Sequence, residues 1–412
     1  MNIAPARFIN RLSAVYIILF CFVPSVQVEN IYRLVVLAAS AIWVISALGI
    51  SSGTISKEMG KFILIAATCV ALMFIWRTNI GSISSAFANV LQPIIMILVA
   101  LISMFMLEYD SEFFNILLTA ILILVCVYCV ITIQATLENP YASRIANSEW
   151  LEERYAGNEH VGLYGYVYMC VFFVPIILYK IVKKIHINLL VDILAYVALV
   201  LIIIMVALAG YMIAILCTIL GIAMVALLNK ITPFRIFLVI CIGIVLWVYR
   251  GQIIEGIIEG AAQVIGDNPV YNDKLEGFRN LYKEGELGDS SWEGRLSNYA
   301  ASFRNIIQYP MFGCYFSGNA GGGGHSTVLD TIGRFGWVIA FLYFKITWDY
   351  PRRLVSGVSK KHPLYFMILT ISVIFGLLDP YCQEMALPWF IFMPYIVYLE
   401  KNQSEYNVRR GI

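Results

Sequence analysis

The sequence predicts an all-α membrane protein of about twelve transmembrane helices, forming a single domain over residues 1–412. Hydrophobic residues make up 60% of the chain and charged residues 13%, against about 45–50% and about 25% in soluble domains. Apolar runs of about 18 residues or more, long enough to cross a bilayer, recur along the chain. Lysine and arginine cluster in every second loop between these runs.

The apolar runs define the expected spans and their order. They cover residues 11–27, 31–50, 61–77, 86–107, 113–134, 162–181, 187–208, 210–229, 233–250, 327–346, 363–378 and 383–399. The first run is expected to remain as an uncleaved anchor, because no small-residue cleavage site follows it. Ala209-Gly210 is the expected turn between two nearly continuous spans, with one kinked unit as the alternative.

The basic clusters predict the orientation of the spans. They fall at Arg7/Arg11, Lys57/Lys61, Lys180/Lys183/Lys184, Lys230/Arg235, Arg352/Arg353/Lys360/Lys361 and Arg409/Arg410. Twelve spans with a cytoplasmic N-terminus place every cluster in the cytoplasm, together with the C-terminus. Single arginines at outer helix ends, such as Arg77, are exceptions. Two long polar loops then face outward, a first loop at 135–160 and a large loop at 252–325.

Several classes of function are disfavoured. A net charge of +2 gives no reason to expect nucleic acid as a partner. The chain has no GxxxxGK[ST] loop for a nucleotide, no zinc-binding cysteine or histidine pattern, and no Asp-x-Asp pair in the outer loops. We therefore expect no cofactor and no metal. A disulfide between Cys314 and Cys382 stays open, since sequence alone does not decide pairing.

Residues 290–308 of the large loop predict an amphipathic helix. Asp289 or Ser290 can cap its start, and Pro310 follows its end. Its apolar stripe, expected to lie against the membrane domain, consists of Trp292, Leu296, Tyr299, Phe303 and Ile306. Arg295 borders this stripe and is expected to be held against the protein, whereas Arg304 points away into solvent.

The segment after this helix carries a glycine run and a histidine. Gly321–Gly324, including Gly323 and Gly324, can wrap a phosphate with backbone N–H groups, or can form a loose surface loop. His325 precedes a span that Ser326 or Thr327 can cap. Its imidazole can accept a proton from a hydroxyl, or serve only as an interfacial residue.

Four further charged residues are candidates at or near this span. Asp330 and Arg334 lie inside it, where charges are functional candidates, although they can also form a structural i, i+4 bridge. Asp379 and Glu384 flank a short outer turn and either shape a cavity or are solvated.

The first outer loop adds one more cation. Arg154 stands close to the sixth span and binds either a substrate or lipid phosphate. Other candidate bases in this loop, which can equally form a solvated acidic face, are Glu152, Glu153, Glu159 and His160.

Two sequence runs, GRLSNYAASFRNIIQYPMFGCYF and GHSTVLDTIGRFGW, resemble the bacterial O-antigen polymerase and ligase superfamily. The pattern is an arginine on an external helix, a Pro-x-x-Gly turn, and a histidine-polar pair entering a late span with glycines. The matching positions are Arg295, Pro310, Gly313, His325, Ser326, Gly333 and Gly336, with Arg154 and Gly157 matching an earlier Arg-x-x-Gly.

The resemblance implies a glycosyltransferase of the GT-C class in the bacterial inner membrane, with its active site facing the periplasm. Donor and acceptor glycans would be carried on undecaprenyl diphosphate, and a chain-length regulator protein is an optional partner. Arg154 and Arg295 would bind the diphosphate, and His325 would deprotonate the acceptor. The further substrate-binding residues would be Gly323, Gly324, Ser326 and Arg334. A ligase acting on lipid A–core, and a transporter of the lipid-linked glycan, are the alternatives.

Overall fold

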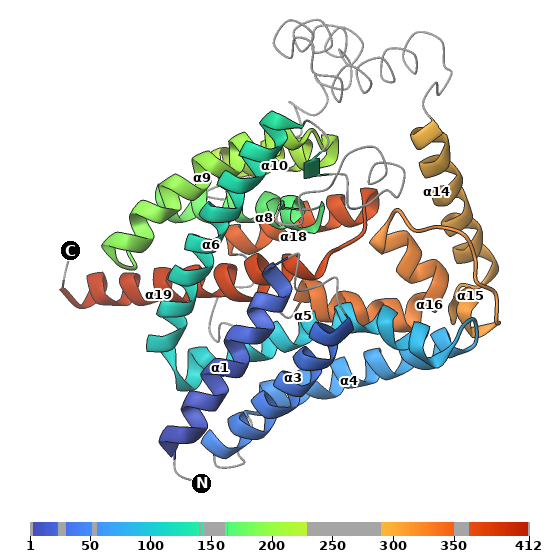
Figure 1. Ribbon diagram of the computed structural model, residues 1–412, viewed down its shortest axis with the longest axis horizontal. Coiled ribbons are helices and arrows are strands. Elements are labelled where there is room, and N and C mark those ends of the chain that lie inside the picture. The colour runs from blue at the N-terminus through green and yellow to red at the C-terminus, as the bar shows by residue number, and fades with distance from the viewer. Residues whose placement is uncertain are drawn as a thin grey trace, which may run out of the picture.

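The computed structural model describes residues 3–23, 30–51, 56–139, 142–143, 161–162, 164–228, 290–349 and 362–410 (Figure 1). All regular elements in these ranges are helical. In chain order they are α1 (Ile3–Phe22), α3 (Asn30–Ile50), α4 (Lys57–Thr78), α5 (Ile83–Tyr109), α6 (Ser111–Glu138), α8 (Tyr164–Val182), α9 (Leu189–Ala209), α10 (Met212–Leu228), α14 (Ser290–Gln308), α15 (Gly313–Phe316), α16 (Thr327–Phe344), η2 (Lys345–Asp349), α18 (Pro363–Leu378), η3 (Gln383–Met385), η4 (Leu387–Phe392) and α19 (Met393–Arg410).

The described part of the chain is an α-helical membrane protein. Eight helices are long and apolar enough to cross a bilayer, and α10 and α18 are shorter apolar helices. Apolar side chains on α9 have no protein cover, as with Leu189, which is 78% exposed. Uncovered apolar faces of this extent require lipid around them.

Most expected spans coincide with one continuous helix, and the exceptions are the spans 233–250, 327–346 and 383–399. The expected span 233–250 lies outside the described residues, as does the polar segment 252–289. The expected span 383–399 is not one α-helix, because a 3-10 turn and a π-helix precede α19, and Pro388 stands in that π-helix. Gly210, with φ 65°, ends α9 in the left-handed conformation, so the predicted turn is confirmed and one kinked unit is excluded.

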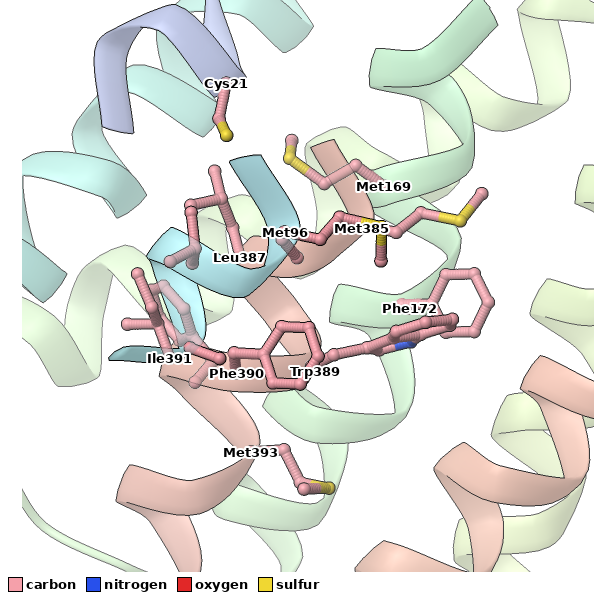
Figure 2. Packing of buried hydrophobic residues seen from close by; sticks show 14 of the residues in the cluster. Cys21, Met96, Met169, Phe172, Met385, Leu387, Trp389, Phe390, Ile391 and Met393 are labelled. Atoms are coloured by element: carbon pink, nitrogen blue, oxygen red, sulfur yellow. The ribbon is translucent and has the colours of Figure 1, made fainter. Parts of the chain in front are cut away.

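Helix α8 lies at the centre of the molecule. In its span 83% of the residues are buried, against 22% for α3. Figure 2 shows Trp389 of η4 packed beside Phe172 of α8, with Phe390 on the other side of Trp389. The rings of Phe172 and Trp389 meet edge to face with centroids 5.3 Å apart. Since lipid tails are as apolar as these side chains, such close packing rather than the hydrophobic effect holds the helices together.

Polar contacts gather at two opposite ends of the helices. At one end, called here the Arg11 end, Arg11 binds Asp110 through two hydrogen bonds of 2.7 and 2.8 Å. Glu400 accepts from Tyr179 at the same end and lies 3.1 Å from His362. These contacts join the middle of α1 and the starts of α6 and α18 to the ends of α5 and α8 and to the interior of α19.

The opposite end, called the Arg295 end, joins α4, α8, α14, α15 and the end of α18. The indole of Trp76 donates to the carbonyl of Phe312 at 2.6 Å, and Arg295 lies 3.7 Å from Asp379. Figure 1 shows α14 and α15 on the side of the molecule away from both termini.

Helix α16 is broken at Gly336, so the expected span 327–346 is not one continuous helix. Gly336 has φ 75° and ψ 171°, and the N–H of the next residue, Trp337, donates to the carbonyl of Pro310 at 2.9 Å. A Cβ on Gly336 would lie 2.2 Å from the oxygen of Met311, and a Cβ on Gly313 would lie 2.2 Å from that of Arg334. The Pro-x-x-Gly turn is therefore docked into the break.

Helix α14 has the predicted bounds, but it buries a different face. Ser302 and Asn305 are 2% and 6% exposed, whereas Leu296 and Phe303 are 49% and 53% exposed. The cause is its close approach to α16, where a Cβ on Gly333 would lie 3.0 Å from the oxygen of Ser302. Small side chains allow this approach, so the predicted apolar stripe is only half-buried or exposed where its side chains are described.

Candidate active site

The carboxylate of Asp379 is the centre of the polar cluster at the Arg295 end. Asp379 is 1% exposed and caps the end of α18, its N–H donating to Phe375 at 2.7 Å. Its carboxylate accepts hydrogen bonds from the hydroxyls of Tyr164 and Tyr168. The Nη1 atom of Arg295 lies 3.7 Å from the Oδ2 atom of the same carboxylate. Helices α8, α14 and α18 thus meet at one carboxylate.

Burial and charge act against each other in this cluster. Burial raises the pKa of Asp379 above its ordinary value, although the two tyrosine hydroxyls, Arg295 and His325 oppose the shift. Burial lowers the pKa of Arg295, but the negative charge of Asp379 and the smaller effects of the neighbouring tyrosines together outweigh it, so the net pKa is raised. As predicted, Arg295 is held against the protein, while Arg304 is exposed.

The N–H of Thr327, two residues after His325, donates to the carbonyl of Asp379 at 3.3 Å, so His325 lies near Asp379. His325 is partly exposed, and it stands between the glycine run and the start of α16. The structure therefore places His325 and Arg295 in the same region, and their predicted catalytic roles stay predictions. Their common neighbour is Asp379.

The glycine run is folded around Asp330. The N–H groups of Gly324 and Ser326 donate to its Oδ2 atom at 2.8 and 3.2 Å, and Ser302 donates to Oδ1. Gly323 has φ 109°, and a Cβ there would lie 2.4 Å from both Oδ1 of Asp330 and Oγ of Ser302. The run is therefore an ordered loop, and the N–H of Gly324 is already used within the protein.

Ser326 has the predicted capping role. Its hydroxyl accepts from the N–H of Leu329 at 3.1 Å and donates to the carbonyl of Gly376 at 2.9 Å. It is 0% exposed, so it has no surface open to a substrate in this structure. Its contribution to the site is to join α16 to α18.

Asp330 and Arg334 do not form the structural bridge considered from their spacing. Asp330 is instead bound by Ser302 and the glycine loop, and Nε of Arg334 is buried without a hydrogen-bond partner in the described residues. The guanidinium of Arg334 lies 5.9 Å from the ring centroid of Tyr315. Both charged residues line a polar cavity of about 180 Å³ between α4, α5, α15 and α16.

Sequence reasoning missed several residues of this region. Arg77, treated there only as an exception to the charge bias, lines the cavity and donates to the hydroxyl of Tyr315 at 2.8 Å. Its place at the end of an otherwise apolar span was a usable signal. Tyr164 and Tyr168 carried a weaker one, as hydroxyls four residues apart on one helix face.

Other candidates are placed differently or lie outside the described residues. Glu384 is buried against Gly165, where a Cβ would lie 2.6 Å from its carboxylate. Cys314 and Cys382 are both free thiols, so no disulfide joins them. The candidates outside the described residues are Glu152, Glu153, Arg154, Gly157, Glu159 and His160.

No group of three or more His, Cys, Asp or Glu residues able to hold a metal occurs in the described part of the chain. The cluster itself offers three kinds of side chain: a guanidinium from Arg295, an imidazole from His325 and a buried carboxylate from Asp379. No protein-family model, no curated protein and no solved structure matches the chain significantly.

Proposed function

We propose that this chain is a membrane glycosyltransferase that polymerises oligosaccharide repeat units, carried on undecaprenyl diphosphate, into O-antigen or a similar polysaccharide. The supporting observation is that Arg295, His325 and Asp379, from three distant parts of the sequence, share one end of the helices. They offer a cation for a diphosphate, a base for a hydroxyl, and a carboxylate that holds the cation. The choice of donor comes from the resemblance of the two sequence runs.

In the proposed reaction, a hydroxyl of the acceptor sugar attacks the anomeric carbon of the donor glycan. The bond from that carbon to the diphosphate breaks, and undecaprenyl diphosphate leaves with the electron pair. His325 takes the proton of the attacking hydroxyl. Arg295 and Arg154 stabilise the negative charge that develops on the leaving diphosphate, so no ATP is needed.

The Arg295–Asp379 geometry suits this role. Their 3.7 Å separation exceeds the roughly 3.2 Å limit of a direct hydrogen bond, so Asp379 orients the guanidinium mainly by charge. The guanidinium N–H groups then stay available for phosphate oxygens, which arginine contacts in pairs. Asp379 is thus a positioning residue in this proposal, and Arg295 the residue that touches substrate.

The proposed setting is the bacterial inner membrane, with the Arg295 end facing the periplasm and both termini in the cytoplasm. A GT-C-like arrangement of about twelve spans is part of the same proposal. The partners would be the lipid-linked donor and acceptor, the bilayer, and optionally a chain-length regulator. The basic clusters of the sequence support this orientation.

The test is a transfer assay with purified full-length protein in lipid nanodiscs, given the lipid-linked repeat unit alone. A ladder of longer glycans supports polymerisation, and transfer only after adding lipid A–core indicates a ligase. Arg295→Ala should lower transfer about 100-fold or more, and Arg295→Lys should restore little, because lysine lacks the paired donors. Arg304→Ala, on the exposed side of the same helix, is the matched control and should transfer normally. Full activity of His325→Ala would refute its role as the base.

Transport of the lipid-linked glycan is a second candidate, and one observation favours it. Helix α16 is interrupted at Gly336, two residues after Arg334, and interrupted helices with nearby charges are typical of transporter binding sites. However, the break is filled by the turn that contains Pro310, not open to a ligand. Movement of the glycan lipid across proteoliposomes without any longer product would favour this candidate.

A further inference from the structure

The polar cavity of about 180 Å³ contains two arginines that come from different helices. Arg77 ends α4, and Arg334 lies just before the break in α16. Their guanidinium carbons lie 4.8 and 5.9 Å from the centroid of the same ring, that of Tyr315. Neither Arg295 nor Asp379 lines the cavity, although Pro380 and Gly324, which adjoin Asp379 and His325, do.

Arg77 is bound only by neutral groups in the described part of the chain. One of its nitrogens donates to the hydroxyl of Tyr315 at 2.8 Å, and the other donates to the side-chain oxygen of Asn89. An arginine at the end of a membrane span usually extends to the lipid headgroups. Arg77 is instead half-buried and directed inward to the cavity, which requires a reason other than membrane anchoring.

Arg334 also lacks an anionic partner among the described residues. Its Nε atom is buried and makes no hydrogen bond there. The nearest candidate anion in sequence, Asp330, has its two oxygens bound by Ser302, Gly324 and Ser326. A buried N–H without a hydrogen bond is costly, so the Nε atom of Arg334 favours an acceptor inside the cavity.

The lining therefore carries a net positive charge. The charged residues of the lining are Arg77, Arg334 and Asp330, so its formal net charge is +1. Two like charges near one ring repel each other in a medium of low dielectric constant, and an anion between them would remove that repulsion. Gly324, which is exposed, is part of the lining, so the cavity reaches the surface.

We propose that this cavity is a binding site for a phosphate or diphosphate group, held between Arg77 and Arg334. Its volume is below the roughly 300 Å³ of a pocket for a drug-sized molecule, so it fits a small charged group and not a whole glycan. Two planar guanidinium groups match phosphate oxygens through paired hydrogen bonds. The proposal does not rest on the glycosyltransferase function, because it concerns binding at a different pair of arginines.

Isothermal titration calorimetry tests the proposal on the full chain in detergent, with inorganic diphosphate as the probe. We expect a diphosphate site that is weakened at least tenfold by Arg77→Gln and by Arg334→Gln and lost in the double variant, while diphosphate binding that depends on Arg295 is kept in all three variants. Arg304→Gln removes one exposed arginine from α14 and should bind within twofold of the unaltered protein. Arg77→Lys and Arg334→Lys keep the charge and the fold but lose the paired donors, so they should bind with intermediate affinity.

A second titration identifies the source of the phosphate group. Dihexanoyl phosphatidic acid carries the same group on a short lipid. If it competes with inorganic diphosphate, the site takes a lipid headgroup, and if it does not bind, the site takes a free phosphate or diphosphate. Diphosphate binding unchanged in the double variant, binding lost in Arg295→Gln but kept in Arg77→Gln, or no binding of either probe to the unaltered protein would each overturn the proposal.

Discussion

The break in α16 can be tested with a single methyl group. Gly336→Ala places a Cβ 2.2 Å from the carbonyl oxygen of Met311, at a residue whose φ is 75°. Backbone strain of this kind costs about 1–3 kcal/mol, and overpacking against rigid backbone costs about 1–3 kcal/mol more. We therefore expect Gly336→Ala to lower the free energy of unfolding by about 2–6 kcal/mol.

Tryptophan fluorescence during heating in detergent measures this change. At roughly 2 °C per kcal/mol for a long chain, the unfolding midpoint should fall by about 4–12 °C. Gly60→Ala is the matched control, because Gly60 lies inside α4 with no atom within 4 Å of the new Cβ. This control should unfold at the same temperature or slightly higher, since alanine favours a helix by about 0.5–1 kcal/mol. If Gly336→Ala unfolds together with the unaltered protein, the docking of the 310–313 turn into α16 is refuted.

Two further substitutions test the polar clusters. Asp379→Asn should lower glycan transfer at least tenfold by releasing Arg295, without lowering the unfolding midpoint at neutral pH, because burial disfavours the ionised carboxylate. Folding raises the pKa of Asp379, so the protonated form of Asp379 stabilises the folded state. This stabilisation is complete below pH 3.8, the ordinary pKa, and is lost as the pH rises through the pKa that Asp379 has in the folded state. Unfolding midpoints of Asp379→Asn should therefore fall less with rising pH than those of the unaltered protein, and an identical pH profile would contradict this. Ser302→Ala removes a donor to buried Asp330 and should cost about 1–3 kcal/mol of stability, measured as above; an unchanged midpoint would show that this contact is not made.

Local sequence signals predicted the regular elements well. The helix over residues 290–308 has the expected bounds, and Ser326 caps α16 as its hydroxyl and position suggested. The turn at Gly210 was also predictable, because glycine adopts the left-handed conformation without strain. Each of these features depends on residues within a few positions of one another, which is the range over which capping and turn chemistry act.

Contacts between distant segments were less predictable. The apolar stripe of α14 suggested which face would be buried, but Gly333 on α16 draws the small residue Ser302 inward instead. In a membrane protein an exposed apolar face carries no penalty where lipid covers it, so hydrophobic periodicity alone does not reveal the protein-facing side. The position of Arg295 was predicted correctly for a different reason, because a charged side chain must avoid lipid on any helix.

The sequence by itself determined that this chain is helical and membrane-embedded, because apolar composition and run length leave no other way to cover its surface. It also pointed to Arg295, Asp330 and Asp379 as candidates, since charges are rare in such a chain, but it did not point to Arg77. Only the tertiary structure decided their partners. Tyr164 and Asp379 are 215 residues apart, and Arg77 and Tyr315 are 238 apart, yet each pair shares a hydrogen bond. Such pairs form when packed helices bring their ends together, and helix packing depends on the shapes of whole faces, which no local pattern records.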